Sequence, residues 1–125
     1  MPKTILIVED FEDSRIFLKY LLGSLGYQVL EAEDGFKAVE IAKRQVPDLI
    51  LMDMALPLIN GLSATKIIRQ FKETSKIPII ALTASGQFIY PQAIAAGCND
   101  LILKPLDADK LQSMIEYYLP EEANP

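Results

Sequence analysis

Five short apolar runs recur along the chain and alternate with segments of helical periodicity. The runs lie at about 4–8, 27–31, 48–52, 77–82 and 100–103. They lack the strict polar alternation of a half-exposed strand, which is typical of strands that are buried on both faces. Strands that alternate with helices form a parallel sheet, and right-handed crossovers place helices on both of its sides. We therefore predict an α/β fold with a doubly wound, five-stranded parallel sheet.

The intervening segments carry apolar residues at helical spacing. We expect helices at about 13–25, 35–45, 61–72, 90–96 and 107–119. In the last of these, Leu111, Met114 and Ile115 follow an i, i+3, i+4 pattern and predict a face that packs on the core. Gly86 and Pro91 leave room for only a short helix in the fourth segment.

Composition and charge exclude several classes of function. The 125 residues suit one domain, and the formal net charge is -5 without a block of Lys and Arg. We therefore expect no direct binding to nucleic acid or to an anionic membrane. Cys98 is the one cysteine, so a disulfide framework is excluded and a cytoplasmic location is expected.

Charged and polar residues stand where the predicted strands end. Glu9 and Asp10 follow the first strand, Asp53 the third, and Lys104 the fifth, while Thr83 closes the fourth. In parallel sheets the ligand crevice lies beyond these carboxyl ends. Three acids and one ammonium group at one rim suit a hard divalent cation and a phosphoryl group. The sequence contains no histidine, so phosphoryl chemistry here must use carboxylates, hydroxyls, lysine and a hard metal.

These residues, in this order, resemble the receiver domain of two-component response regulators over residues 3–119. The features that carry the resemblance are Glu9-Asp10, the Asp53…Pro57…Gly61 loop, Thr83-Ala84, Ala96-Gly97 and Lys104-Pro105. The resemblance implies a flavodoxin-like (βα)5 fold with strand order 2-1-3-4-5. We expect the receiver domain to occupy residues 1–119, and residues 120–125 to form a short solvated tail with no effector domain.

The resemblance also implies a phosphoacceptor and a metal site. Asp53 matches the aspartate that attacks a phosphohistidine or a small phosphodonor and becomes an acyl phosphate. Glu9 and Asp10 match the acidic pair that holds Mg²⁺ together with Asp53 and the main-chain carbonyl of Ala55. The chemistry agrees, because clustered carboxylates repel one another and favour capture of a dication.

Three further positions follow from the same resemblance. Lys104 matches the lysine that pairs with the acceptor and then with the phosphoryl oxygens. Thr83 matches the hydroxyl residue that hydrogen-bonds the phosphoryl group. The bond before Pro105 is a candidate for the cis conformation. The implied function is that of a phosphorelay signalling protein, which catalyses only its own phosphorylation and dephosphorylation. Its expected partners are a histidine kinase or a histidine phosphotransfer protein, and a downstream protein.

Two departures from the family pattern keep an alternative open. Leu101 stands where most receivers carry an aromatic switch residue, and we expect it to stay in the core. The stretch 83–97, which includes Pro91, is about one residue shorter than in common members. A degenerate receiver that binds partners without phosphorylation is therefore the alternative function. Candidate partner-contacting or packing aromatics near the fourth and fifth helices are Phe88, Tyr90, Tyr117 and Tyr118.

Two other classes fit less well. A phosphatase of the haloacid-dehalogenase type also uses an aspartate at a strand end, but it needs a second acid two residues later, where this chain has Ala55. A flavodoxin-like flavin binder needs a phosphate cradle rich in hydroxyl groups and glycine, whereas residues 9–15 form an acidic loop.

Overall fold

The computed structural model describes residues 2–84 and 86–120, with residues 86–88 described by their backbone alone. Residues 121–125 of the expected tail lie outside the described residues. The strands are β1 (Thr4–Val8), β2 (Gln28–Ala32), β3 (Leu49–Asp53), β4 (Ile79–Thr83) and β5 (Asp100–Leu103). The helices are α1 (Glu12–Ser24), α2 (Gly35–Gln45), α3 (Gly61–Arg69), α4 (Gly86–Ala96) and α5 (Ala108–Tyr118), with a 3-10 turn, η1, at Lys72–Thr74.

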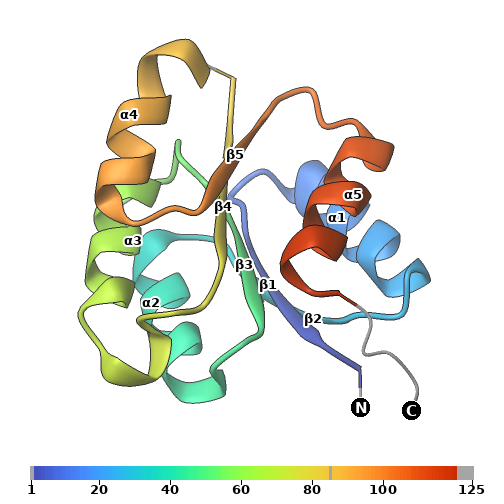
Figure 1. Ribbon diagram of the computed structural model, residues 1–125, viewed down its shortest axis with the longest axis horizontal. Coiled ribbons are helices and arrows are strands. Elements are labelled where there is room, and N and C mark those ends of the chain that lie inside the picture. Colours follow the sequence, from blue (N-terminus) through green and yellow to red (C-terminus); the bar gives the residue numbers. More distant parts are fainter. Residues whose placement is uncertain (1, 85, 121–125) are drawn as a thin grey trace.

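The strands form one parallel sheet in the order β2-β1-β3-β4-β5. Helices α2, α3 and α4 cover one face, and α1 and α5 cover the other (Figure 1). The fold class and the strand order predicted from the sequence are confirmed. Among the described residues, the helices are too short or too polar for any of them to cross a membrane.

The core has two halves, one on each side of the sheet. Successive strand residues point to opposite faces, so Leu6 packs beneath α2–α4 and its neighbour Ile7 packs beneath α1 and α5. On β3, Ile50 and Leu51 divide between the halves in the same way, and all four side chains are fully buried. Burial on both faces explains why these strands are apolar without alternation.

Two helices differ from the prediction. Helix α4 begins at Gly86 rather than near residue 90 and continues through Pro91. Pro91 is the sixth residue of the helix, so its missing N–H removes one intrahelical hydrogen bond and the helix tolerates it. Helix α3 ends at Arg69 rather than near residue 72. The hydroxyl of Thr74 donates a hydrogen bond to the carbonyl of Ile68, which turns the chain into η1.

The start of α3 lies directly against the end of β3. Asn60 caps the helix, because its side chain accepts a hydrogen bond of 2.9 Å from the N–H of Ser63. A Cβ atom placed on Gly61 would collide with the main-chain oxygen of Asp53 and lie 2.9 Å from the Cα of Met54. Both neighbours are backbone atoms, which cannot rotate away. Gly61 is therefore required where α3 approaches the residue that ends β3.

We predict that Gly61→Ala lowers the free energy of unfolding by about 1–3 kcal/mol, because the added methyl group forces the two elements apart. Urea unfolding followed by circular dichroism measures the loss. Gly23→Ala in α1 is the matched control, since a Cβ atom there meets nothing within 4 Å. That variant should be neutral or gain up to about 1 kcal/mol through helix propensity. Equal stabilities for Gly61→Ala and the native protein would contradict the prediction.

Candidate functional site

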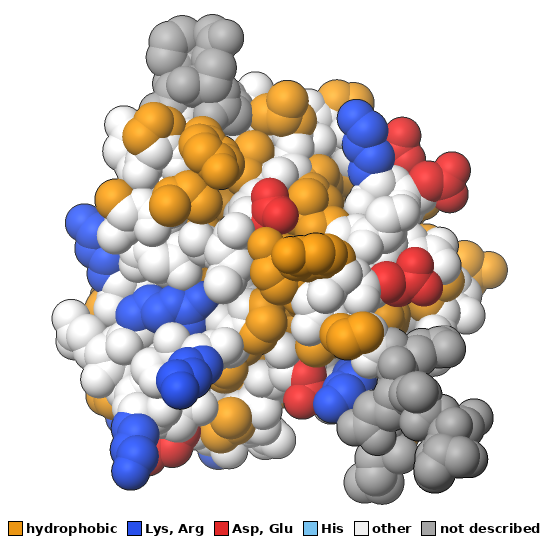
Figure 2. Space-filling model, viewed as in Figure 1, with side chains coloured by type: hydrophobic (Ala, Val, Ile, Leu, Met, Phe, Trp, Pro, Cys, Tyr) orange, Lys and Arg blue, Asp and Glu red, His pale blue; other side chains and the backbone are white. Residues whose placement is uncertain are grey.

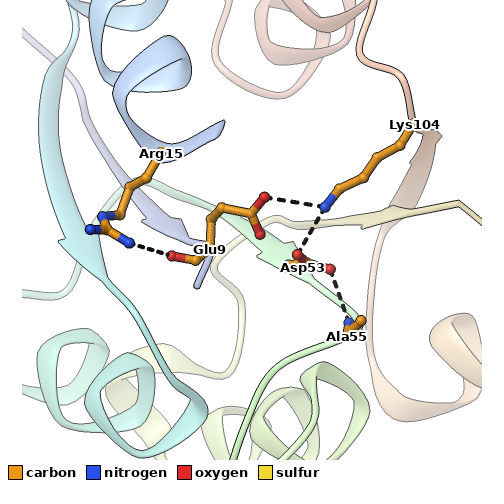
Figure 3. A network of polar contacts seen from close by, with 5 residues as sticks. All are labelled: Glu9, Arg15, Asp53, Ala55 and Lys104. Atoms are coloured by element: carbon orange, nitrogen blue, oxygen red, sulfur yellow. Dashed lines mark hydrogen bonds and ion pairs between the residues drawn. The ribbon is translucent and has the colours of Figure 1, made fainter. Parts of the chain in front are cut away.

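Four strands bring their polar ends together at one edge of the sheet. Asp53 is the last residue of β3 and Thr83 the last of β4, while Glu9 and Lys104 directly follow β1 and β5. The parallel register brings the ends of β3 and β4 side by side, because Asp53 pairs with Leu82, the residue before Thr83. Figure 3 shows Glu9, Asp53 and Lys104 pointing toward one another.

Lys104 joins two of the carboxylates. Its Nζ donates to Asp53 Oδ2 at 2.9 Å and to Glu9 Oε1 at 3.2 Å (Figure 3). The other Asp53 oxygen, Oδ1, accepts the N–H of Ala55 at 2.9 Å. Both oxygens of the Asp53 carboxylate therefore face hydrogen-bond donors.

Glu9, Asp10 and Asp53 form an acidic cluster that is suited to a metal ion. One carboxylate oxygen from each lies within 4.8 Å of the others. Glu9 and Asp53 are buried, at 1% and 4% exposure, whereas Asp10 is exposed and open to solvent. Glu9 Oε2 is a buried oxygen without a hydrogen-bond partner among the described residues. Because such an oxygen is costly in a folded protein, the donor set fits a hard cation that accepts carboxylate oxygen and water.

Burial and neighbouring charges shift the pKa values of the groups in the site in different directions. Burial, followed by contact with Asp53, raises the pKa of Glu9 to about 7 against the weaker pull of Lys104. Burial also disfavours ionised Asp53, but the nearby Glu9 carboxyl group and the hydrogen bonds from Lys104 and Ala55 outweigh it and lower the pKa of Asp53. Burial opposes the charge on Lys104 as well, yet Asp53 and Glu9 together raise its pKa. At neutral pH the site therefore holds an ionised Asp53 beside an ammonium group, with Glu9 as the weakest acid.

Arg15 on α1 supports the site, and no sequence pattern predicts this role. Its guanidinium donates to the main-chain carbonyl of Glu9 at 2.9 Å (Figure 3). It also pairs with Glu31 on β2 at 3.4 Å. These bonds fix the turn that carries Glu9 and Asp10. A single arginine on a helix carries no sequence signal for such a contact, because the contact depends on how α1 packs beside β2.

The other predicted residues lie on β4, on β5 and in the loops that follow β3 and β5. Thr83 is nearly buried, and its carbonyl accepts the N–H of Lys104 at 2.8 Å, which ties the ends of β4 and β5 together. The bond between Lys104 and Pro105 is cis, in agreement with the expectation. Leu101 is partly buried and packs against the core beneath α2–α4, as expected. Ala55 contributes its N–H, and the metal role of its carbonyl stays a prediction.

The predicted aromatic residues divide between packing and exposure. Tyr118 is partly buried and donates hydrogen bonds to Asp100 Oδ2 at 3.0 Å and to the Asn99 carbonyl at 3.1 Å. Burial, followed by the contact with Asp100, raises the pKa of Tyr118 to about 12. Tyr90 and Tyr117 are exposed. The side chain of Phe88 lies outside the described residues.

Comparison with known proteins gives a consistent result. A family model described as the response regulator receiver domain matches residues 5–116. The polar-differentiation response regulator DivK of Brucella anthropi is 36% identical over 120 residues, which cover 95% of this chain and 98% of DivK.

Two solved structures are similar over nearly their whole length. The receiver domain of the sensor histidine kinase PA1611 from Pseudomonas aeruginosa, with a magnesium ion coordinated in its active site cleft, has a TM-score of 0.90 and 38% identity. That similarity covers 97% of this chain and 100% of the other. The receiver domain of a histidine kinase from Syntrophus aciditrophicus has a TM-score of 0.86 and 29% identity, covering 98% and 97%.

The family match, the similarity to DivK along almost the full length, and the five-stranded topology agree with one another. The chain belongs to the response regulator receiver domain family of two-component signalling systems.

Proposed function

We propose that the chain is a phosphoacceptor of a two-component phosphorelay, with Asp53 as the acceptor. The observation that carries this proposal is the position of the Asp53 carboxylate, which contacts the ammonium group of Lys104 and forms an acidic cluster with Glu9 and Asp10. An Asp53 oxygen attacks the phosphorus of a phosphohistidine or a small phosphodonor. The new O–P bond forms as the donor's N–P or O–P bond breaks, and the leaving group keeps the electron pair.

The protein's contribution to this step is positioning and charge neutralisation, since phosphoryl transfer passes through a loose transition state. Lys104 holds the carboxylate at 2.9 Å before transfer, and its charge then compensates the phosphoryl oxygens. The N–H of Ala55 orients the second carboxylate oxygen. The hydroxyl of Thr83, on the neighbouring strand, is the proposed hydrogen-bond donor to the phosphoryl group.

Glu9, Asp10 and Asp53 would hold Mg²⁺, with the main-chain carbonyl of Ala55 as a further ligand. When bound, the ion supplies positive charge to the transferred oxygens. The orphaned oxygen of Glu9 supports this assignment, as does the magnesium ion in the related PA1611 receiver domain.

We further propose that the receiver domain spans residues 1–119, acts in the cytoplasm and receives its phosphoryl group from a histidine kinase or a histidine phosphotransfer protein. Phosphorylation would change its binding to a downstream protein. The domain is a signalling protein whose chemistry is confined to its own aspartate.

One observation favours a second candidate, a degenerate receiver that binds partners without phosphorylation. Leu101 is packed against the core and has no ring to change places when Asp53 is modified. A titration with beryllofluoride and Mg²⁺ followed by NMR separates the two functions. Shifts around Thr83 support the phosphoacceptor, whereas unchanged spectra there support the degenerate module.

We expect Asp53→Asn to abolish acyl-phosphate formation, because an amide cannot attack phosphorus as the carboxylate does. The native protein, treated with acetyl phosphate and Mg²⁺, should gain the mass of one phosphoryl group in intact mass spectrometry. Asp109→Asn, an exposed position on α5, is the matched control and should be modified like the native protein. Undiminished modification of Asp53→Asn would refute the assignment.

We expect Leu101→Tyr to change the affinity for a protein partner more than the rate of phosphorylation. The residue lies on β5, away from the carboxylate that receives the phosphoryl group, and a switch element biases the output rather than the transfer. Acetyl phosphate kinetics and a binding titration with the cognate partner measure the two effects. A large loss of phosphorylation rate with unaltered binding would contradict this expectation.

The raised pKa of Glu9 predicts a pH-dependent stability of the metal-free protein. Protonated Glu9 stabilises the folded state. This contribution is complete below about pH 4.5 and is lost as the pH rises through about 7. Stability should therefore fall between pH 5 and pH 8, by on the order of 3 kcal/mol, because each pKa unit corresponds to about 1.4 kcal/mol.

Glu9→Gln should remove most of that fall, because the amide does not titrate. Thermal unfolding in EDTA across this pH range tests the effect, and added Mg²⁺ should restore the native protein at pH 8 more than the variant. Exposed Glu116→Gln is the control and should keep the native pH profile. If Glu9→Gln keeps the native dependence of stability on pH, the prediction is wrong and other groups cause that dependence.

A further inference from the structure

The charge of the chain is divided unequally between two parts of the surface. Residues 35–76, which include α2, α3 and η1, contain seven Lys and Arg against four Asp and Glu, although the whole chain is acidic. The rest of the chain has five Lys and Arg against thirteen Asp and Glu. In Figure 2, the blue side chains gather at the lower left, where Figure 1 places α2 and α3, and the red ones lie mostly on the other half.

An apolar groove of about 630 Å³ lies within this basic surface, between α2 and α3. We call it the α2–α3 groove, and its lining residues are Phe36, Val39, Glu40, Lys43, Arg44 and Ile67. Phe36 is 58% exposed, and Val39 and Ile67 are partly buried. An aromatic side chain left this open on a helix, beside two aliphatic ones, offers apolar area that a partner can bury.

The cations around the groove are available to a partner. Lys43 is exposed and lies 4.1 Å from the ring centre of Phe71, which holds its ammonium group at the edge of the groove. Arg44 pairs with Glu40 at 3.2 Å, but both side chains are more than half exposed. A surface pair of this kind contributes at most about 1 kcal/mol, so an acidic partner can replace it. Exposed Lys66 and Lys72 extend the positive charge along α3 and η1.

The apolar surface continues toward the loop that joins β3 to α3. The Ile59 side chain lies against Gly35, at the start of α2, since a Cβ atom on Gly35 would collide with it. The preceding residue, Leu58, is 76% exposed and has a left-handed backbone with φ of 69°. Leucine rarely adopts that conformation. Leu58 therefore adds an exposed apolar side chain to the loop whose Ile59 contacts the start of α2.

We infer that the α2–α3 groove is a docking site for an acidic amphipathic helix of another protein. Apolar side chains of that helix would lie against Phe36, Val39 and Ile67, in the mode in which an amphipathic helix occupies a groove. Its Asp and Glu residues would face Lys43 and Arg44. The positive charge would attract either an acidic protein segment or nucleic acid, but the apolar lining favours the protein segment, because it has no counterpart in a phosphate backbone.

The test uses the unphosphorylated full chain and a synthetic probe helix. The probe is a fluorescent peptide of about five turns built from Glu, Ala and Leu, with Leu at i, i+3, i+4 and i+7. Fluorescence anisotropy gives its Kd, and NMR shifts locate the site. We expect shifts in α2, α3 and η1, and affinity that falls as salt is added.

The double variant Phe36→Ala, Lys43→Glu should raise the Kd about tenfold or more. The matched control Tyr20→Ala, Lys110→Glu removes an exposed aromatic and reverses an exposed lysine on α1 and α5. It should leave the Kd within about twofold. Arg44→Glu serves as a second variant, and circular dichroism confirms that each protein is folded.

Any one of four results would overturn the inference. The first is probe binding that is equal in both double variants, and the second is NMR shifts confined to α1, α4 or α5. The third is tighter binding of a short DNA duplex or of vesicles that contain phosphatidylglycerol, which would assign the basic surface to a polyanion. A peptide with Lys in place of Glu should not bind, and its binding would exclude charge complementarity. Because Asp53 is unmodified throughout, these outcomes are independent of the proposed phosphoacceptor function.

Discussion

Burial of the central strands on both faces governs the rest of the structure. β1, β3 and β4 lie in the middle of the sheet with helices on either side, and the strand segments Ile5–Val8, Leu49–Met52 and Ile79–Leu82 are fully buried. A charged side chain has no favourable place along such a strand. Charged groups therefore fall at the strand ends, and because the strands are parallel, the ends that carry them meet at one edge. The site follows from the way the core is built.

At that edge, the main energetic cost is the burial of acidic groups close to one another. Glu9 and Asp53 are both buried and both acidic, and Lys104 is the cation that contacts the two of them. The compensation is incomplete, as the orphaned Oε2 and the raised pKa of Glu9 show. A site with too little positive charge favours the binding of a dication, and the acidic cluster of Glu9, Asp10 and Asp53 could hold one. The same imbalance underlies the proposed metal site and the predicted pH dependence of the metal-free protein.

The sequence predicted what depends on local pattern. The strands and the meeting of Glu9, Asp53 and Lys104 follow from apolar runs and from the polar residues that end them, whereas the order of the strands was implied by the resemblance to receiver domains. The start of α4 was wrong because propensity overstates the effect of Pro91 in a helix that loses only one hydrogen bond there. The contact of Arg15 with the Glu9 carbonyl was missed because it depends on tertiary packing. The α2–α3 groove also escaped prediction, because residues from two helices combine only after folding.

Two segments connect Asp53 with the surface of the domain, and they differ in how well they could transmit a chemical change at Asp53. One runs through β4 and β5, where Leu101 is partly buried and packs against the core. Leu101 has no ring that could move between an exposed and a buried position, so we expect it to be a poor switch. The other runs along the loop that follows β3, from the Ala55 hydrogen bond to the exposed side chain of Leu58. The middle of that loop is exposed, while Asn60 and Gly61 fix its far end against α3 and β3. Because Ile59 in this loop lies against Gly35 at the start of α2, the second segment leads toward the α2–α3 groove rather than toward the face formed by β5.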